Sequence, residues 1–197
     1  MAYILGYFIA DGSMMINNRG AKFLDFSSVD KELIVSIKST LKSEHKIKRR
    51  IRARTKPVFR LQVGSKDIFN DLLKFGIMPN KTGIEVMPNI PKKYFADFLR
   101  GYFDGDGTVS IYNRKDRNSK TILTGFTCKN KTFLEIIKKT LYDSKIVDGG
   151  TLFYSAKVWR LCFSVRDSKS LYNFMYNDYG DKLYLRRKKS VFKKFFK

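Results

Sequence analysis

An internal repeat limits the folds open to this 197-residue chain more than any other feature of its sequence. The segment ILGYFIADGSM at residues 4–14 is matched by LRGYFDGDGTV at 99–109, with the two Asp-Gly pairs 95 positions apart. Further matches follow at an offset of 100: FSSVDKEL at 26–33 with FTCKNKTF at 126–133, and Phe59-Arg60-Leu61 with Trp159-Arg160-Leu161. Landmarks in the same order at nearly constant spacing predict two copies of one supersecondary unit.

Each copy is predicted to contain the same elements in the same order. A short helix ends at Asp-Gly, two strands follow, and a helix then begins after Asp30 or Asn130, which are N-cap residue types. Two more strands (47–54 and 58–64, or 151–155 and 157–165) precede a helix from Lys66 or Ser168, and a basic helix is expected over 185–196. We therefore predict an α+β fold of two half-domains, 1–78 and 93–197, joined by a linker at 79–92 in the segment rich in Pro and Gly.

Charge points to the class of partner. Forty Lys and Arg against 18 acids give a net charge of +22, which favours a polyanion and above all a nucleic acid. No apolar run is long enough to span a bilayer, and the apolar start is interrupted by Asp11, so we expect an intracellular protein that is not secreted. Cys128 and Cys162 form no zinc pattern, and the lone His45 disfavours a Ser-His-Asp mechanism.

The glycines before each Asp-Gly pair need an explanation. A helix places Gly6 and Ala10 on one face, and likewise Gly101 and Gly105. Glycine costs a helix about 1 kcal/mol relative to alanine. Small residues four positions apart allow two helices to approach closely. We therefore expect these helices to pack together, which would bring Asp11 and Asp106 side by side.

Two adjacent carboxylates repel each other, so they call for a counter-charge. A divalent metal supplies it, and hard oxygen ligands suit magnesium. Metals held near a phosphodiester can activate water and stabilise the leaving oxygen. The alternative is that each Asp-Gly only ends a helix and turns the chain, as single Asp-Gly pairs commonly do. Two copies in the same context favour the paired site.

Both segments resemble the LAGLIDADG motif of homing endonucleases, and the two repeats resemble the single-chain members of that family. Motif one is ILGYFIADG at residues 4–12 and motif two is LRGYFDGDG at 99–107. The resemblance implies αββαββα halves with saddle-shaped antiparallel sheets, packed through the motif helices. It also implies a monomer that cleaves both strands of a long double-stranded DNA target and leaves 3′ overhangs. One departure is Ile9, which stands where motif two keeps Asp104.

The resemblance also implies roles for individual residues. Asp11 and Asp106 would bind Mg²⁺, or Ca²⁺ or Mn²⁺ in its place, assisted by the carbonyls of Ala10 and Gly105. A basic residue beside each metal site would be Lys81 in the first half. In the second half it would be Lys188, with Arg187 or Lys182 as substitutes.

Strand periodicity predicts the residues that contact DNA. Period two places Lys48, Arg50, Arg52 and Arg54 on one face of a cationic ribbon. A ribbon of two strands can enter a major groove, although a charged edge that prevents aggregation is the alternative. By the same alternation the outward-facing candidates are Ser13, Met15, Asn17, Arg60 and Gln62 in the first half, and Thr108, Ser110, Tyr112, Arg114 and Arg160 in the second. Residues 149–155 are nearly uncharged, so the two half-sites are expected to differ.

Three other functions stay open. A non-cutting binder on the same scaffold, such as an intron RNA-splicing maturase or a transcription factor, would share the charge and the repeat. An intein-borne copy is less expected, because a leading nucleophile and a closing His-Asn are not seen. A ribosomal-type protein would not need glycines and acids repeated at matched places.

Overall fold

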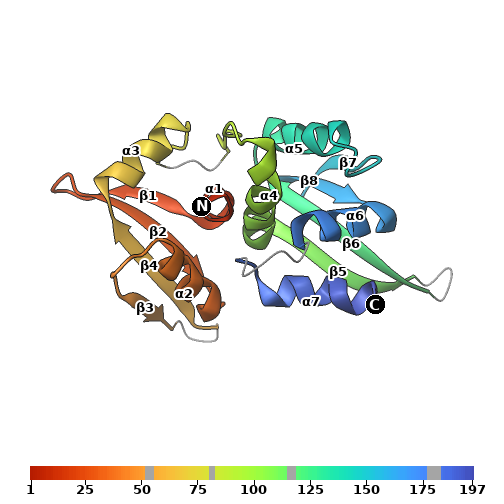
Figure 1. The fold of residues 1–197 in the computed structure, drawn as a ribbon, viewed down its shortest axis with the longest axis horizontal. Helices are drawn as coiled ribbons and strands as arrows, with labels where there is room; N and C mark the ends of the chain where they lie inside the picture. The colour runs from red at the N-terminus through yellow and green to blue at the C-terminus, as the bar shows by residue number, and fades with distance from the viewer. Residues whose placement is uncertain (52–55, 80–82, 115–118, 177–182) are drawn as a thin grey trace. The chain divides into compact units, whose positions relative to one another are not determined.

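The structure is a computed structural model that describes residues 1–51, 56–79, 83–114, 119–176 and 183–197 (Figure 1). Its contacts divide the chain into two compact units. The first contains Met1–Lys81 with Pro88–Gly105, and the second contains Thr82–Met87 with Asp106–Lys197.

The first unit contains a four-stranded antiparallel sheet with strand order β1-β2-β4-β3. Its elements are α1 (Ala2–Asp11), β1 (Ser13–Ile16), β2 (Lys22–Ser28), α2 (Lys31–Thr40), β3 (Ile47–Arg50), β4 (Val58–Gly64) and α3 (Lys66–Lys74). Both α2 and α3 lie against the sheet. Most of α4 (Lys92–Asp106) also belongs to this unit.

The second unit repeats this arrangement with strand order β5-β6-β8-β7. Its elements are β5 (Gly107–Arg114), β6 (Ser119–Cys128), α5 (Lys131–Asp143), β7 (Thr151–Ser155), β8 (Val158–Phe163), α6 (Val165–Tyr176) and α7 (Arg186–Phe195). The helix α7 packs against α6 and β5 (Figure 1). The predicted α+β fold with two repeats is confirmed.

Two boundaries differ from the sequence prediction for local reasons. Helix α6 begins at Val165 rather than near Ser168, because Ser164 accepts hydrogen bonds from the backbone N–H groups of Asp167 and Ser168, at 3.1 and 2.8 Å. Strand β3 ends at Arg50, which pairs with Val58, the first residue of β4. Pro57 precedes Val58 and has no N–H to extend the ladder.

The register of each sheet separates an apolar face from a polar one. Phe26 pairs with Leu61 and Leu24 with Val63, and all four side chains are buried on the face that α2 covers. The second sheet repeats the pattern with Phe126 opposite Leu161, under α5. Cross-strand partners share a face, so the intervening residues all point to the opposite side.

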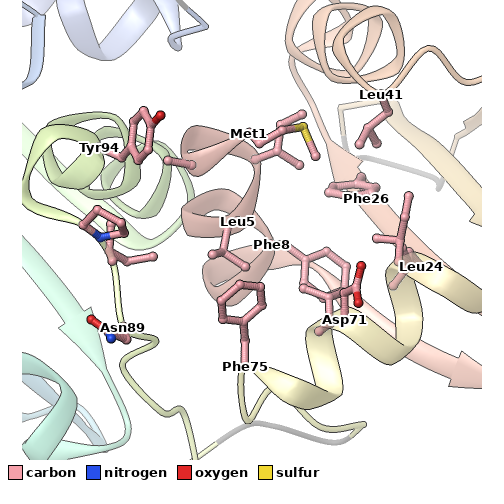
Figure 2. Close-up of a pocket in the computed structure, with 16 residues that line it drawn as sticks. Met1, Leu5, Phe8, Leu24, Phe26, Leu41, Asp71, Phe75, Asn89 and Tyr94 are labelled. Carbon is pink, nitrogen blue, oxygen red and sulfur yellow. The ribbon is translucent and has the colours of Figure 1, made fainter.

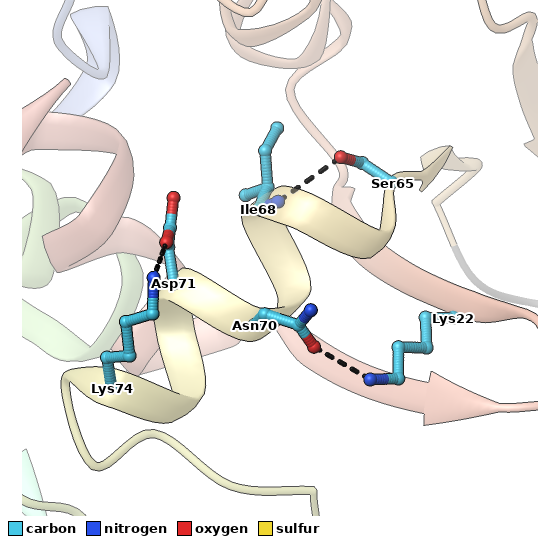
Figure 3. Close-up of polar contacts among 6 residues, drawn as sticks. All are labelled: Lys22, Ser65, Ile68, Asn70, Asp71 and Lys74. Carbon is cyan, nitrogen blue, oxygen red and sulfur yellow. Dashed lines mark hydrogen bonds and ion pairs between the residues drawn. The ribbon is translucent and has the colours of Figure 1, made fainter.

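Helix α3 is tied to the first sheet by polar contacts (Figure 3). The side chain of Ser65 caps its N-terminus by accepting a hydrogen bond from the backbone N–H of Ile68, at 3.2 Å. Lys22 of β2 donates to the side-chain oxygen of Asn70 at 2.7 Å, and its ammonium lies over the ring of Phe69. On the exposed side of the helix, Lys74 pairs with Asp71.

Helices α1 and α4 pack backbone to backbone at the predicted glycines. A Cβ atom at Gly6 would lie 2.0 Å from the carbonyl oxygen of Phe98, and one at Gly101 would lie 2.0 Å from that of Tyr3. Real Cβ atoms do not approach so closely, so only glycine fits at either position. The predicted reason for the helical glycines is confirmed.

The departure from the motif at Ile9 is matched by a second difference. Asp104 is buried, and it accepts a hydrogen bond of 2.7 Å from the hydroxyl of Tyr3 on α1. By the 95-residue offset, the counterparts of Asp104 and Tyr3 are Ile9 and Phe98, which are both apolar and buried. The acid and the hydroxyl therefore occur together or not at all, and Asp104 serves the packing of the helices.

We predict that Gly6→Ala destabilises the protein, although alanine favours a helix by about 1 kcal/mol over glycine. Overpacking typically costs about 1–3 kcal/mol, and here the new methyl meets backbone that cannot rotate away. Urea unfolding followed by circular dichroism measures the difference. Gly149→Ala is the control, since no atom lies within 4 Å of a Cβ built there. Equal stability of the two variants would contradict the packing described.

Candidate functional site

Asp11 and Asp106 are the last residues of α1 and α4. Asp11 is exposed, and Asp106 is half-buried. Next to Asp11, a Cβ atom at Gly105 would lie 2.3 Å from the Cβ of Ala10 and 3.4 Å from the Oδ2 of Asp11. The absence of a side chain at Gly105 thus keeps space beside this carboxylate, and Asp106 is the next residue of α4.

Electrostatics at both helix ends favour a bound cation. The C-terminus of a helix carries a partial negative charge from its last carbonyl groups. In both α1 and α4 this charge adds to that of the aspartate, and neither helix has a basic residue in its last turn. A carboxylate with backbone carbonyls is the hard oxygen donor set that Mg²⁺ and Ca²⁺ prefer. The residues present therefore fit a divalent metal.

No larger ligand cluster competes with this interpretation in the described ranges. Among them, no group of three or more His, Cys, Asp or Glu side chains is placed to hold a metal ion.

The pKa of Tyr7 is affected by the charge of Asp11. Its phenol is buried and donates a hydrogen bond of 2.8 Å to the carbonyl oxygen of Ser27. Burial raises the pKa of Tyr7 well above its ordinary value, and the charge of Asp11 raises it further. Tyr7 is therefore a neutral donor that fixes α1 to β2.

Lys188 lies against the residue that follows Asp106. Its ammonium group is buried and donates a hydrogen bond of 2.6 Å to the carbonyl oxygen of Gly107. The side chain of Thr127 holds the same turn by donating to the carbonyl oxygen of Asp106, at 2.8 Å. Sequence reasoning expected a basic residue near the second motif, and the structure places Lys188 there.

Arg187, one of the two alternatives to Lys188, differs from it in exposure. Arg187 is exposed on the first turn of α7. Lys182, like the first-half candidate Lys81, lies outside the described residues. Since a helix N-terminus carries partial positive charge, the basic start of α7 at Arg186 favours a nearby anion.

The polar face of the first sheet contains most of the contact residues predicted for the first half. Ser13 pairs with Asp25 and Asp25 with Gln62, while Ser27 pairs with Arg60 and Arg60 with Lys48. Met15 lies on the same face, and Arg50 lines a pocket there with Ser13, Asp25 and Arg60. Arg52 and Arg54 of the predicted ribbon lie outside the described residues.

Asn17, another candidate from the first half, lies one residue beyond the end of β1, in the hairpin turn. Strand β1 ends at Ile16, and the side-chain oxygen of Asn17 accepts hydrogen bonds from the backbone N–H groups of Arg19 and Ala21, both at 2.9 Å. An asparagine that closes a hairpin in this way stabilises the turn.

Asp25 is a residue that sequence reasoning missed. It is 7% exposed and forms an ion pair with Arg60, whose pKa is raised mainly by the hydrogen bond to this carboxylate. The signal was available, because Asp25 stands between the buried Leu24 and Phe26 and must point to the opposite face.

The polar face of the second sheet carries less charge. Thr108, Ser110, Tyr112 and Arg114 are exposed along β5, as predicted from their alternation. Arg160 pairs with Thr127 and with Phe153, so Phe153 stands where Lys48 stands in the first sheet. The predicted inequality of the two sheets is therefore present in their strands.

A second pocket of the first unit has a different character (Figure 2). It is lined by apolar side chains of α1, β2 and α3, including Leu5, Phe8, Phe26 and Phe75, with Asp71 and Asn89 among the few polar groups. Such a lining offers little to a phosphodiester or a metal.

None of the helices in the described part of the chain is long and apolar enough to cross a membrane.

Comparison with known proteins identifies the family. The family model of the LAGLIDADG-like domain matches residues 1–75 and 94–147. A search of curated protein sequences finds no match.

Solved structures share the fold. The homing endonuclease I-LtrWI, solved bound to its target DNA, is 15% identical with a TM-score of 0.63, covering 99% of this chain and 87% of its own. I-DmoI, solved in complex with DNA and Mn, is 17% identical with a TM-score of 0.59, covering 91% and 97%. I-SmaMI, solved with uncleaved DNA in the presence of calcium ions, is 11% identical with a TM-score of 0.59, covering 89% and 83%. The predicted resemblance is confirmed: this chain belongs to the LAGLIDADG family, with both of its motifs in one chain.

Proposed function

We propose that this chain is a homing endonuclease that cleaves both strands of a long, asymmetric double-stranded DNA site and leaves 3′ overhangs. The observation that carries the proposal is the repeated aspartate at the C-terminus of a motif helix, where helix charge and carboxylate together call for a divalent cation. Similar structures contain DNA with Mn or calcium ions, which supports this reading of the site. Because one chain carries both motifs, we expect it to act as a monomer.

The roles of the residues follow from their chemistry. Asp11 and Asp106 would hold Mg²⁺, with the carbonyls of Ala10 and Gly105 as further oxygen donors. The metal would activate water and stabilise the leaving oxygen of the phosphodiester. Lys188, held at Gly107, would orient the phosphate or the water near Asp106. Lys81 is proposed for the same role beside Asp11, from the family resemblance alone.

The polar faces of the sheets would contact the DNA. The cations Lys48, Arg50 and Arg60 on the first sheet supply charge for phosphates and guanines, while the second sheet offers Thr108, Ser110 and Tyr112 with Arg160. Unequal faces imply unequal half-sites. With a net charge of +22, affinity should fall steeply as salt increases.

We predict that Asp11→Asn and Asp106→Asn each abolish double-strand cleavage but leave DNA binding intact. Loss of a group that only supports a metal ligand lowers activity about 10- to 100-fold, so loss of the ligand itself should cost at least about 100-fold. Cleavage of a selected target is measured with Mg²⁺, and binding with Ca²⁺. Asp71→Asn and Asp143→Asn are the controls, since both carboxylates are exposed and pair with lysines on their own helices. Cleavage at the wild-type level by either motif variant would overturn the proposal.

We predict that Lys188→Met lowers the cleavage rate about 10- to 100-fold while binding in Ca²⁺ changes little, because residues that orient the groups around a metal site typically contribute on this scale. Arg187→Met removes the same charge from an exposed position of the same helix and serves as the matched comparison. Thermal melting of both variants shows whether the buried site still folds. A larger loss in Arg187→Met than in Lys188→Met would assign the role to Arg187 instead.

We predict that bound target DNA protects Cys162 from alkylation. Cys162 lies half-buried on the polar face beside Thr151, whereas Cys128 is buried. Burial raises the pKa of the Cys162 thiol, partly offset by the charge of Arg160. Its reaction with a maleimide should therefore be slow near neutral pH and accelerate as the pH increases. Mass spectrometry with and without duplex measures protection, and an unchanged rate would place DNA elsewhere.

A further inference from the structure

We propose that Asp25 is a positioning residue that fixes the guanidinium of Arg60 to read one guanine-containing base pair, and that the second sheet has no equivalent. The inference rests on the proposed function, because it needs a DNA duplex on the polar face of the first sheet. It adds a source of specificity that neither the motif nor the metal site supplies.

The contact is built into the sheet. Asp25 lies on the central strand β2 with Ser13 on one side and Gln62 on the other. Its Oδ2 accepts a hydrogen bond from the Nε–H group of Arg60 on β4 and forms an ion pair with Nη2 of the same guanidinium. The Asp25 side chain is 9% exposed and that of Arg60 is 25% exposed, so the carboxylate lies beneath the guanidinium.

This geometry leaves one edge of the arginine for a ligand. The contact with Asp25 uses the Nε edge, and Nη1 takes no part in it. The remaining donors on Nη1 and Nη2 form the fork that binds the O6 and N7 acceptors of guanine in the major groove. A guanidinium already held in place loses less conformational freedom on binding than a free side chain does.

The surroundings of Arg60 suit a groove contact. Arg60, Asp25, Ser13 and Arg50 line one polar pocket on the open face of the sheet. Lys48 is the direct cross-strand neighbour of Arg60. Lys48 and Arg50 can contact phosphates. The side chain of Arg60 is held by its ion pair with Asp25 and cannot move to a phosphate with them. Arg60 is thereby assigned to a base edge.

The second sheet offers an internal comparison. Arg160 occupies the place of Arg60, since it pairs with Thr127 as Arg60 pairs with Ser27. The place of Asp25, between β5 and β8, is taken by Gly125. In the part of the chain that the structure describes, no carboxylate pairs with Arg160. A Cβ atom at Gly125 would lie 3.0 Å from the carbonyl oxygen of Leu161, so a carboxylate there would also be crowded.

The test is selection of bound duplexes from a randomised library in Ca²⁺, followed by affinity measurements on all single-base variants of the selected site. We compare wild type with Asp25→Asn, which keeps the shape and removes the charge, and with Arg60→Lys, which keeps the ion pair and removes the fork. Both variants should lose discrimination at the same single base-pair position by about 5- to 150-fold. Arg160→Lys is the matched control and should leave discrimination at that position unchanged.

Each outcome decides the matter. Loss of preference at one shared position, with affinity for non-specific duplex retained, supports the role of Asp25. If Asp25→Asn keeps the wild-type preference at every position, Asp25 has no positioning role, although the proposed function stands. Uniform loss of affinity for all duplexes would make the ion pair purely structural. Should Asp25→Asn fail to fold, Asp25→Gly, which introduces the residue that the second sheet has at this place, replaces it in the same comparison. A wild type that selects no sequence overturns the proposed function as well.

Discussion

Helices α1 and α4 approach each other so closely that only glycine fits at two positions of their contact. Gly6 and Gly101 admit the carbonyl oxygens of Phe98 and Tyr3 where a Cβ atom would stand. Near these two positions, the hydroxyl of Tyr3 donates a hydrogen bond to the buried Asp104, and the hydroxyl of Tyr7 donates one to the carbonyl oxygen of Ser27 on β2. Helix α1 ends at Asp11 and α4 ends at Asp106, the acids of the two motifs.

The two repeats share a fold but not a surface. The buried positions are equivalent in the two sheets, as the pairs Phe26 with Leu61 and Phe126 with Leu161 show. The polar faces diverged, since Asp25 corresponds to Gly125 and Lys48 to Phe153. A single chain can vary one face independently of the other. This freedom allows a target without two-fold symmetry, which a symmetric dimer reads less readily.

The repeat, the face on which each strand residue lies and the packing role of the glycines could be predicted from the sequence, because each of these is a periodic or duplicated pattern. It failed where a single local contact decides. Helix α6 begins three residues earlier than predicted because of Ser164, and the side chain of Asn17 is held by hydrogen bonds in a turn just beyond β1. The alternation of β2 could have marked Asp25 as a residue of the polar face, but its ion pair with Arg60 depends on the register between β2 and β4, which the sequence does not define. Lys188 could be named as a candidate, but its contact with Gly107 depends on how α7 packs.

The central claim is that the two motif acids serve one double-strand cut at an asymmetric site. Selection of cleaved duplexes from a randomised library in Mg²⁺, with both new ends of each product sequenced, tests this most directly. We expect one family of long, non-palindromic sites cut at a fixed position in both strands, with no products when the metal is chelated. A library that stays uncut in Mg²⁺, or products that are nicked at scattered positions, would contradict it.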